Sequence, residues 1–216
     1  MAPNVYEHIQ SKSFPCVMAK SLLKRGNLEV KNIDSIENNI DEIYKTVIEF
    51  SHKLKKDDKT IRSLIFEFEY ETNFDEFESS FWNLLNQMLR LDEQNFKHDD
   101  SVSSDPHDNN FSYSLAETSY FLILLHPESP RLSRRSPKPC IVFNPHKQFV
   151  KLKKENKFFK IRNLIRKFDK KLQGFINPMM ADHGVNSEIL QYTGKIYKNI
   201  HECPIDKLRR KSHAYS

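Results

Sequence analysis

Glycine is scarce in this chain, with four residues among 216. Loops that cradle phosphate groups need several closely spaced glycines, so the sequence excludes a nucleotide site of that kind. Cysteine is scarce too: Cys16, Cys140 and Cys203 are an odd number at wide spacings, which fit neither a zinc site nor a disulfide framework. The serine nucleophile elbow of α/β-hydrolases is also missing.

Long apolar runs are missing as well. None approaches the roughly 20 residues that a membrane-spanning helix needs, and the N-terminus has no signal-peptide core. We therefore expect a cytoplasmic protein without membrane partners. The net charge of +5 is modest, so it does not by itself indicate nucleic acid as a partner. Apolar residues at 38% and aromatic residues at 12% indicate a globular chain.

The pattern of apolar residues predicts one α+β domain over residues 1–206, with a mostly antiparallel sheet packed against several helices, and a basic tail at 207–216. Asp34 or Ser35 is the expected cap of the first of these helices. The predicted elements are, in order, a helix at 36–54, a strand with one partly wet face at 61–70, a helix capped by Asn73 and ending near Asp92, a surface loop or lid at 97–110, hairpin strands at 111–115 and 119–125, a strand at 140–143, and helices at 145–152 and 161–172.

One apolar run ends at a histidine and is followed by an arginine-rich turn. The stretch FLILLHPESPRLSRR predicts a buried strand that ends at His126, with Arg131, Arg134 and Arg135 beyond it. Guanidinium groups bind carboxylates or phosphates, and imidazole can ligate a metal. This edge would therefore suit a cofactor with an electrophilic centre and acidic arms. The alternative for His126 is a histidine satisfied within the core.

Cys16 is a second candidate ligand. In the segment SFPCVMAKSLL, Pro15 precedes an expected helix start, where the positive end of the helix dipole favours a thiolate that could ligate haem iron. The alternative is a small buried side chain packed against its apolar neighbours. His146 and His183 are weaker candidates, because only a proline or a glycine turn lies beside them.

Basic residues are dense between Lys147 and Lys171 and alternate with phenylalanines, a pattern that would suit a surface for nucleic acid. Helical spacing places most of these phenylalanines on the buried side, however, so an ordinary solvated face is the preferred interpretation. The loop at 97–110 contains aspartates and histidines but no recognised metal-ligand spacing.

Five segments carry a family resemblance: FPCVMAK at 14–20, FESSFWNLL at 77–85, HPESPRLSRR at 126–135, FNPHKQF at 143–149, and LQGFINPMM continuing to SEILQYTG. In their order and spacing they resemble the YqcI/YcgG family over nearly the whole chain. That family includes haem-dependent enzymes that hydroxylate a guanidino or related nitrogen of arginine-like amino acids. The resemblance therefore implies haem b with its iron, dioxygen, an electron donor and an amino-acid-like small-molecule substrate.

Haem needs an axial donor and cations for its propionates. From their positions in the sequence, His126 is the first expected axial ligand and Cys16 the second. Propionates are expected to bind the three arginines of the turn, Arg131, Arg134 and Arg135. Imidazole and thiolate differ chemically, because a thiolate pushes electron density toward O–O cleavage.

Asn177 in GFINPMM and Glu188 in VNSEILQY are the expected substrate contacts, because a carboxylate can grip a guanidinium through paired hydrogen bonds. The alternatives are a turn residue and a helix-start residue. The predicted function is a haem-dependent monooxygenase acting on a guanidino or amino nitrogen. The alternative is a non-catalytic protein that binds haem or, through its basic surface, a polyanion.

Overall fold

A computed structural model describes residues 4–12, 14–69, 73–180, 185–198 and 202–204, so the predicted tail at 207–216 lies outside the described residues. Within these ranges the predicted α+β class is confirmed, with a five-stranded, mostly antiparallel sheet of order β1-β2-β5-β4-β3. The strands are β1 (Leu28–Ile33), β2 (Ser63–Phe68), β3 (Tyr113–Leu115), β4 (Thr118–Leu125) and β5 (Cys140–Pro145). β1 and β2 run parallel, and the other neighbouring pairs are antiparallel.

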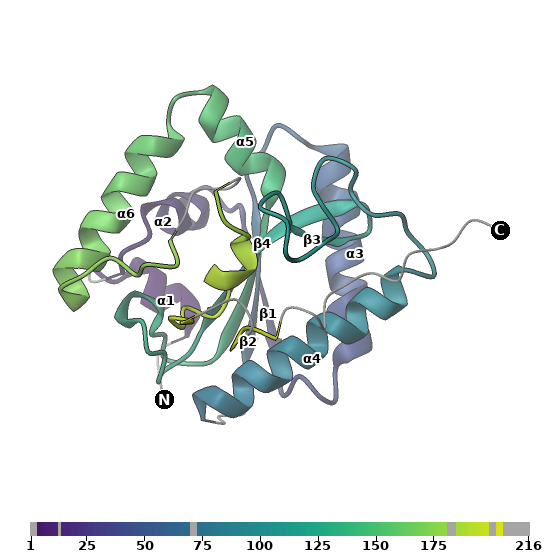
Figure 1. The fold of residues 1–216 in the computed structure, drawn as a ribbon, viewed down its shortest axis with the longest axis horizontal. Helices are drawn as coiled ribbons and strands as arrows, with labels where there is room; N and C mark the ends of the chain where they lie inside the picture. Colours follow the sequence, from purple (N-terminus) through teal and green to yellow (C-terminus); the bar gives the residue numbers. More distant parts are fainter. Residues whose placement is uncertain (1–3, 13, 70–72, 181–184, 199–201, 205–216) are drawn as a thin grey trace.

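Helices cover both faces of the sheet, with α3 and α4 on one side and α1, α2 and α6 on the other (Figure 1). The α-helices are α1 (Val5–Gln10), α2 (Val17–Lys24), α3 (Ile40–Lys56), α4 (Phe74–Asp92), α5 (His146–Lys154) and α6 (Phe158–Gln173), and two short 3-10 helices are η1 (Leu132–Arg134) and η2 (Glu188–Gln191). Strand side chains alternate between the two layers. Phe66 and Phe143 thus belong to the core under α3 and α4, whereas Ile65 and Val142 belong to the core under α1 and α2. None of the helices in the described part of the chain is long and apolar enough to cross a membrane.

Local sequence signals account for several confirmed elements. The Asn73 side chain accepts the backbone N–H of Glu76 and caps α4. Ala116 and Glu117 have φ angles of 48° and 56° and form the two-residue turn that joins β3 to β4, as the predicted hairpin requires. Helix α6 ends before Gly174, whose φ of 86° is readily adopted by glycine.

Other predictions were wrong. Helix α3 begins at Ile40 and not after Asp34 or Ser35, because the Asp34 carboxylate accepts the N–H of Ser35 and the side-chain amide of Asn39 and holds the chain in a turn. Strand β2 has no wet face: all six residues are buried, since β1 and β5 flank it and helices cover both sides. Strand β1 was not predicted at all.

The polar loop at 97–110 is anchored to the sheet through the buried Asp99. Its carboxylate accepts the backbone N–H and the hydroxyl of Ser119, at 3.1 and 2.9 Å, and both the N–H and the hydroxyl of Ser101. Nowhere in the described residues do three or more His, Cys, Asp or Glu side chains gather closely enough to hold a metal ion. Asp99 therefore stabilises the loop through hydrogen bonds.

Asp99→Asn tests this anchor. Burial raises the pKa of the Asp99 carboxyl, but hydrogen bonds from Ser101 and Ser119 outweigh burial and lower the pKa below its usual value. A depressed pKa in the folded state stabilises the fold above the ordinary aspartate pKa, and that contribution is lost as pH falls through the folded-state pKa. We expect Asp99→Asn to lower the free energy of unfolding by about 1–3 kcal/mol near pH 7.

The difference in the free energy of unfolding between Asp99→Asn and the unmodified protein should shrink as the pH is lowered toward about 3. At that pH the Asp99 carboxyl is increasingly protonated in both the folded and the unfolded state. Urea unfolding near pH 7 and at about pH 3 measures this difference in stability. The exposed neighbour provides a control, Asp100→Asn. An equal loss in that control, or a loss independent of pH, would contradict the anchoring role.

Candidate functional site

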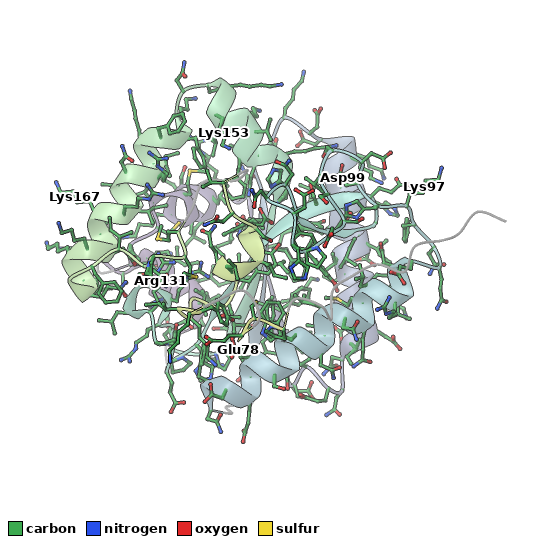
Figure 2. All side chains as sticks on the ribbon, viewed as in Figure 1. Glu78, Lys97, Asp99, Arg131, Lys153 and Lys167 are labelled. Carbon is green, nitrogen blue, oxygen red and sulfur yellow. The ribbon has the colours of Figure 1, made fainter. Side chains whose placement is uncertain are left out.

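Asp169 of α6 is fully buried and holds the loop that follows β4. Arg131 donates from Nε to its Oδ1 at 3.1 Å, and the Ser133 hydroxyl donates to the same oxygen. The other oxygen, Oδ2, accepts the side-chain amide of Gln173 at 3.2 Å and the backbone N–H of Asn177 at 3.4 Å. One carboxylate therefore connects α6, η1 and the segment after α6. Figure 2 shows Arg131 on the inner side of α6.

Arg134 lies beside this pair and is 7% exposed. Its two terminal nitrogens donate to the carbonyl oxygens of Tyr192 and Gln191 at 3.3 and 3.2 Å. Burial lowers the pKa of the Arg134 guanidinium to about 9, and repulsion from Arg131 contributes in the same direction. The guanidinium thus connects η1 to η2 and has an environment that would be stabilised by a further negative charge.

Cys16 is the N-cap residue of α2, which confirms the expected helix start. Burial raises the pKa of its thiol. The backbone N–H groups of Ala19 and Met18 and the positive charges of Arg134 and Lys20 act in the opposite direction. Neither N–H group makes a capping hydrogen bond of normal geometry to the sulfur, so their effect on the pKa is that of nearby dipoles.

His126 lies beneath the arginine-rich loop, with 2% of the residue exposed. Its ring packs against Phe74 and Phe77, with centroid distances of 5.6 Å to each. Nδ1 accepts the backbone N–H of Glu128 at 3.0 Å, and the backbone N–H of His126 donates to the carbonyl oxygen of Arg134. An axial role for this histidine would therefore depend on Nε2 alone.

Two other predicted residues take different positions. Arg135 is exposed and donates from Nε to the Ser129 carbonyl oxygen at 3.1 Å. Asn177 is buried; its amide donates to the Gly194 carbonyl oxygen at 3.0 Å and its oxygen accepts the Met179 N–H at 2.8 Å. Of the three arginines, Arg135 is thus the one at the surface, while the Asn177 contacts are those of a turn residue.

Glu188 belongs to a second polar cluster, on the side of η2 that covers β3 and β4. Its Oε1 accepts the Ser112 and Tyr192 hydroxyls at 2.7 and 2.8 Å, and its Oε2 lies 3.6 Å from Nδ1 of His146. Burial, together with the negative charge of Glu188, raises the pKa of the Tyr192 hydroxyl well above its usual value. A guanidinium that bound Glu188 would share the carboxylate with these donors. His183, the third histidine considered, lies outside the described residues.

Two surface hollows lie along α4, away from these clusters. The smaller has a volume of about 260 Å³ and is lined by Asp75, Glu78, Ser79, Trp82, Lys195, Tyr197, Glu202 and Pro204. The larger, of about 460 Å³, is lined by Glu37, Asn38, Ile40, Asp41, Gln87, Arg90, Leu91 and Gln94. Neither includes a residue predicted as a site residue. Lys195 bridges Asp75 and Glu78 in the smaller hollow and fastens the C-terminal segment to α4.

A model of the YqcI/YcgG family matches residues 5–206. The chain belongs to the YqcI/YcgG family. No curated protein and no solved structure matches it. Four of the segments through which the sequence resembles the YqcI/YcgG family meet in the fold. Cys16 and Arg134 interact across two of them, Arg134 binds the backbone of the SEILQYTG segment, and Glu188 of that segment faces His146 of FNPHKQF.

Asp169→Asn tests whether the carboxylate holds this family region together. Removing one partner of a buried ion pair leaves an uncompensated charge, so we expect the free energy of unfolding to fall by about 3–5 kcal/mol. Hydrogen exchange should also increase in η1 and η2, because Arg131 and Arg134 position both. Asp58→Asn, at an exposed turn, removes the same charge and should change stability little. Equal stability of the two variants would refute the anchoring role.

Proposed function

We propose that this member of the YqcI/YcgG family is a haem-dependent monooxygenase that hydroxylates a guanidino or amino nitrogen of an arginine-like small molecule. The observation that carries the proposal is the environment of Cys16. Its thiol lies at the start of α2; burial raises the pKa of this thiol, and the positive charge of Arg134 acts in the opposite direction. The family resemblance supplies the cofactor and the reaction class.

The charges around Cys16 favour an anion at the sulfur. Arg131 and Arg134 place two guanidiniums in a buried cluster that contains one carboxylate, from Asp169. A thiolate would supply the second negative charge. Burial raises the pKa of the free thiol, but a coordinated metal replaces the thiol proton. We therefore place Cys16 ahead of His126 as the axial ligand, which reverses the order expected from the sequence.

The three arginines differ in how well they could bind a haem propionate. Arg131 and Arg134 are engaged with Asp169 and with backbone carbonyl oxygens, so they fit the positioning of the loop better than direct contact with a propionate. Arg135 is exposed and is the proposed propionate contact. Haem, when bound, would supply the oxidising chemistry, and a thiolate ligand favours O–O cleavage.

The substrate contact in this proposal is Glu188, whereas Asn177, which binds the Gly194 carbonyl oxygen and the Met179 N–H, positions the turn after α6. The Ser112 and Tyr192 hydroxyls hold the Glu188 carboxylate in one orientation, which would pre-organise it for a cationic nitrogen. Hydroxylation of that nitrogen takes one oxygen atom from dioxygen and releases the other as water, with the consumption of two electrons and two protons. The chain would therefore need an external electron donor.

Absorption spectroscopy of protein produced with a haem precursor tests the proposal. We expect a Soret band, and a red-shifted carbonyl complex of the thiolate type after reduction under carbon monoxide. Cys16→Ser should abolish that shifted band or the bound haem, because serine removes the thiolate. Cys203→Ser is the matched control, because Cys203 belongs to the core under α3 and α4 while Cys16 packs against the other core, and burial raises the pKa of the Cys203 thiol to about 12.

Circular dichroism confirms that each variant is folded. Folded protein that shows no Soret band, although it was produced with a sufficient supply of haem, would contradict the proposal. A carbonyl spectrum of the imidazole type that is lost in His126→Gln and kept in Cys16→Ser would assign the iron to His126 instead. Haem binding without conversion of an arginine-like substrate, even with reductant and dioxygen, would favour the non-catalytic alternative.

A further inference from the structure

Exposed apolar side chains concentrate on α6 and the turn after it. Six large apolar residues there are between 36% and 50% exposed, namely Phe159, Leu164, Phe168, Leu172, Phe175 and Ile176. Leu164, Phe168 and Leu172 recur every four residues and therefore form one stripe on the helix. This stripe lies roughly a quarter of a turn from Asp169, which faces the interior.

A row of exposed lysines borders the stripe: Lys160, Lys167 and Lys171. Figure 2 shows Lys167 at the outer edge of the molecule, pointing away from Arg131. We call the apolar stripe and this lysine row together the α6 face. From Lys147 to Lys171 the sequence has eleven basic and two acidic residues, against a net charge of +5 for the whole chain, so the remainder is net negative.

Both acidic residues of this segment are already paired within the protein. Glu155 binds Lys157, and Asp169 is buried against Arg131. The outer side of α6 therefore combines partly exposed apolar groups with basic groups that repel one another. Such a surface is complementary to a partner that presents apolar contacts within an acidic rim.

The geometry favours an acidic protein as that partner. A helix that binds a membrane surface inserts its apolar side chains about 5–10 Å into the lipid, whereas Leu164, Phe168 and Leu172 expose less than half of their surface. A second copy docked through the same face would bring two lysine rows together. Bases of a nucleic acid stack on aromatic or arginine planes, which Phe168 offers, but Leu164 and Leu172, the other two members of the stripe, would have no role in that binding.

We infer that the α6 face is the docking surface for an acidic one-electron carrier protein. This inference rests on the proposed function, in which each hydroxylation consumes two electrons and two protons along with dioxygen. Helix α6 also connects that surface to the interior, because Asp169 binds the loop that carries Arg131. A carrier on the α6 face would thus bind the same helix that holds the loop carrying Arg131 and Arg134.

The test uses a plant-type [2Fe–2S] ferredoxin as the probe, with binding measured by calorimetry at low and at high ionic strength. We expect the triple variant Lys160→Glu, Lys167→Glu, Lys171→Glu to weaken binding at least about tenfold at low salt, and added salt to weaken binding to the original chain. The matched control Lys31→Glu, Lys45→Glu, Lys97→Glu makes the same change in net charge at exposed sites away from α6 and should weaken binding about twofold at most. If the charge reversals disturb folding, Lys→Gln at the same three positions gives a milder form of the test.

In haem-loaded protein, ferredoxin-driven reduction should slow in the α6 variant while reduction by dithionite is unchanged. Equal weakening by the two triple variants, or no binding of the ferredoxin to the original chain, would overturn the inference. Binding to phosphatidylserine vesicles or to single-stranded DNA with no binding of the ferredoxin would also overturn it, in favour of those ligands. Calorimetry does not require haem, so failure of docking is distinguishable from failure of the proposed function.

Discussion

The buried ion pair between Arg131 and Asp169 is the contact on which the candidate site depends. Asp169 is one of two acidic residues in a strongly basic segment, yet it faces inward and uses both oxygens. Its contact with Arg131 fixes η1, and η1 in turn positions Arg134 to bind the carbonyl oxygens of Gln191 and Tyr192. A buried charge pair is costly to desolvate and adds little stability by itself. Its value here is positional, because it brings distant segments of the chain into one arrangement.

That arrangement leaves a charge imbalance inside the protein. Among the described residues, the guanidiniums of Arg131 and Arg134 lie near one buried carboxylate, that of Asp169, and the pKa of Arg134 is lowered first by burial and further by repulsion from Arg131. An anion near Arg134 would raise that pKa again, and Cys16 is the group placed to supply it. The thiol and the guanidinium are thus coupled: ionisation of either favours the charged form of the other. This coupling gives a physical reason for Cys16 at the start of α2 to lie near Arg134 of η1.

The sequence predicted most of what depends on local signals. The cap at Asn73, the hairpin turn at Ala116 and the end of α6 at Gly174 are each specified by residues within one turn. Strand β1 escaped prediction because it is a short edge strand with a polar end, and its parallel partner lies 35 residues further along the chain. The burial of β2 on both faces was missed because Glu67 looks exposed in sequence. In the fold, its carboxylate accepts the backbone N–H of Val5 from α1.

In the candidate site, too, the sequence predicted what depends on neighbouring residues and did not predict what depends on distant contacts. The position of Cys16 at a helix start followed from its neighbours, but the contacts of Arg131 and Arg134 did not, because their partners lie 38 to 58 residues away. Asp169 gave no signal in a helix whose pattern indicated only an apolar stripe and a basic face. Yet an acidic residue surrounded by lysines and arginines can form an ion pair at the surface without the desolvation free energy that burial of the pair requires. Its burial therefore implies that the position of the loop matters more than the desolvation it costs, and it also leaves the outer side of α6 without an acidic residue. One inward-facing carboxylate thus shapes both the interior cluster and the surface opposite it.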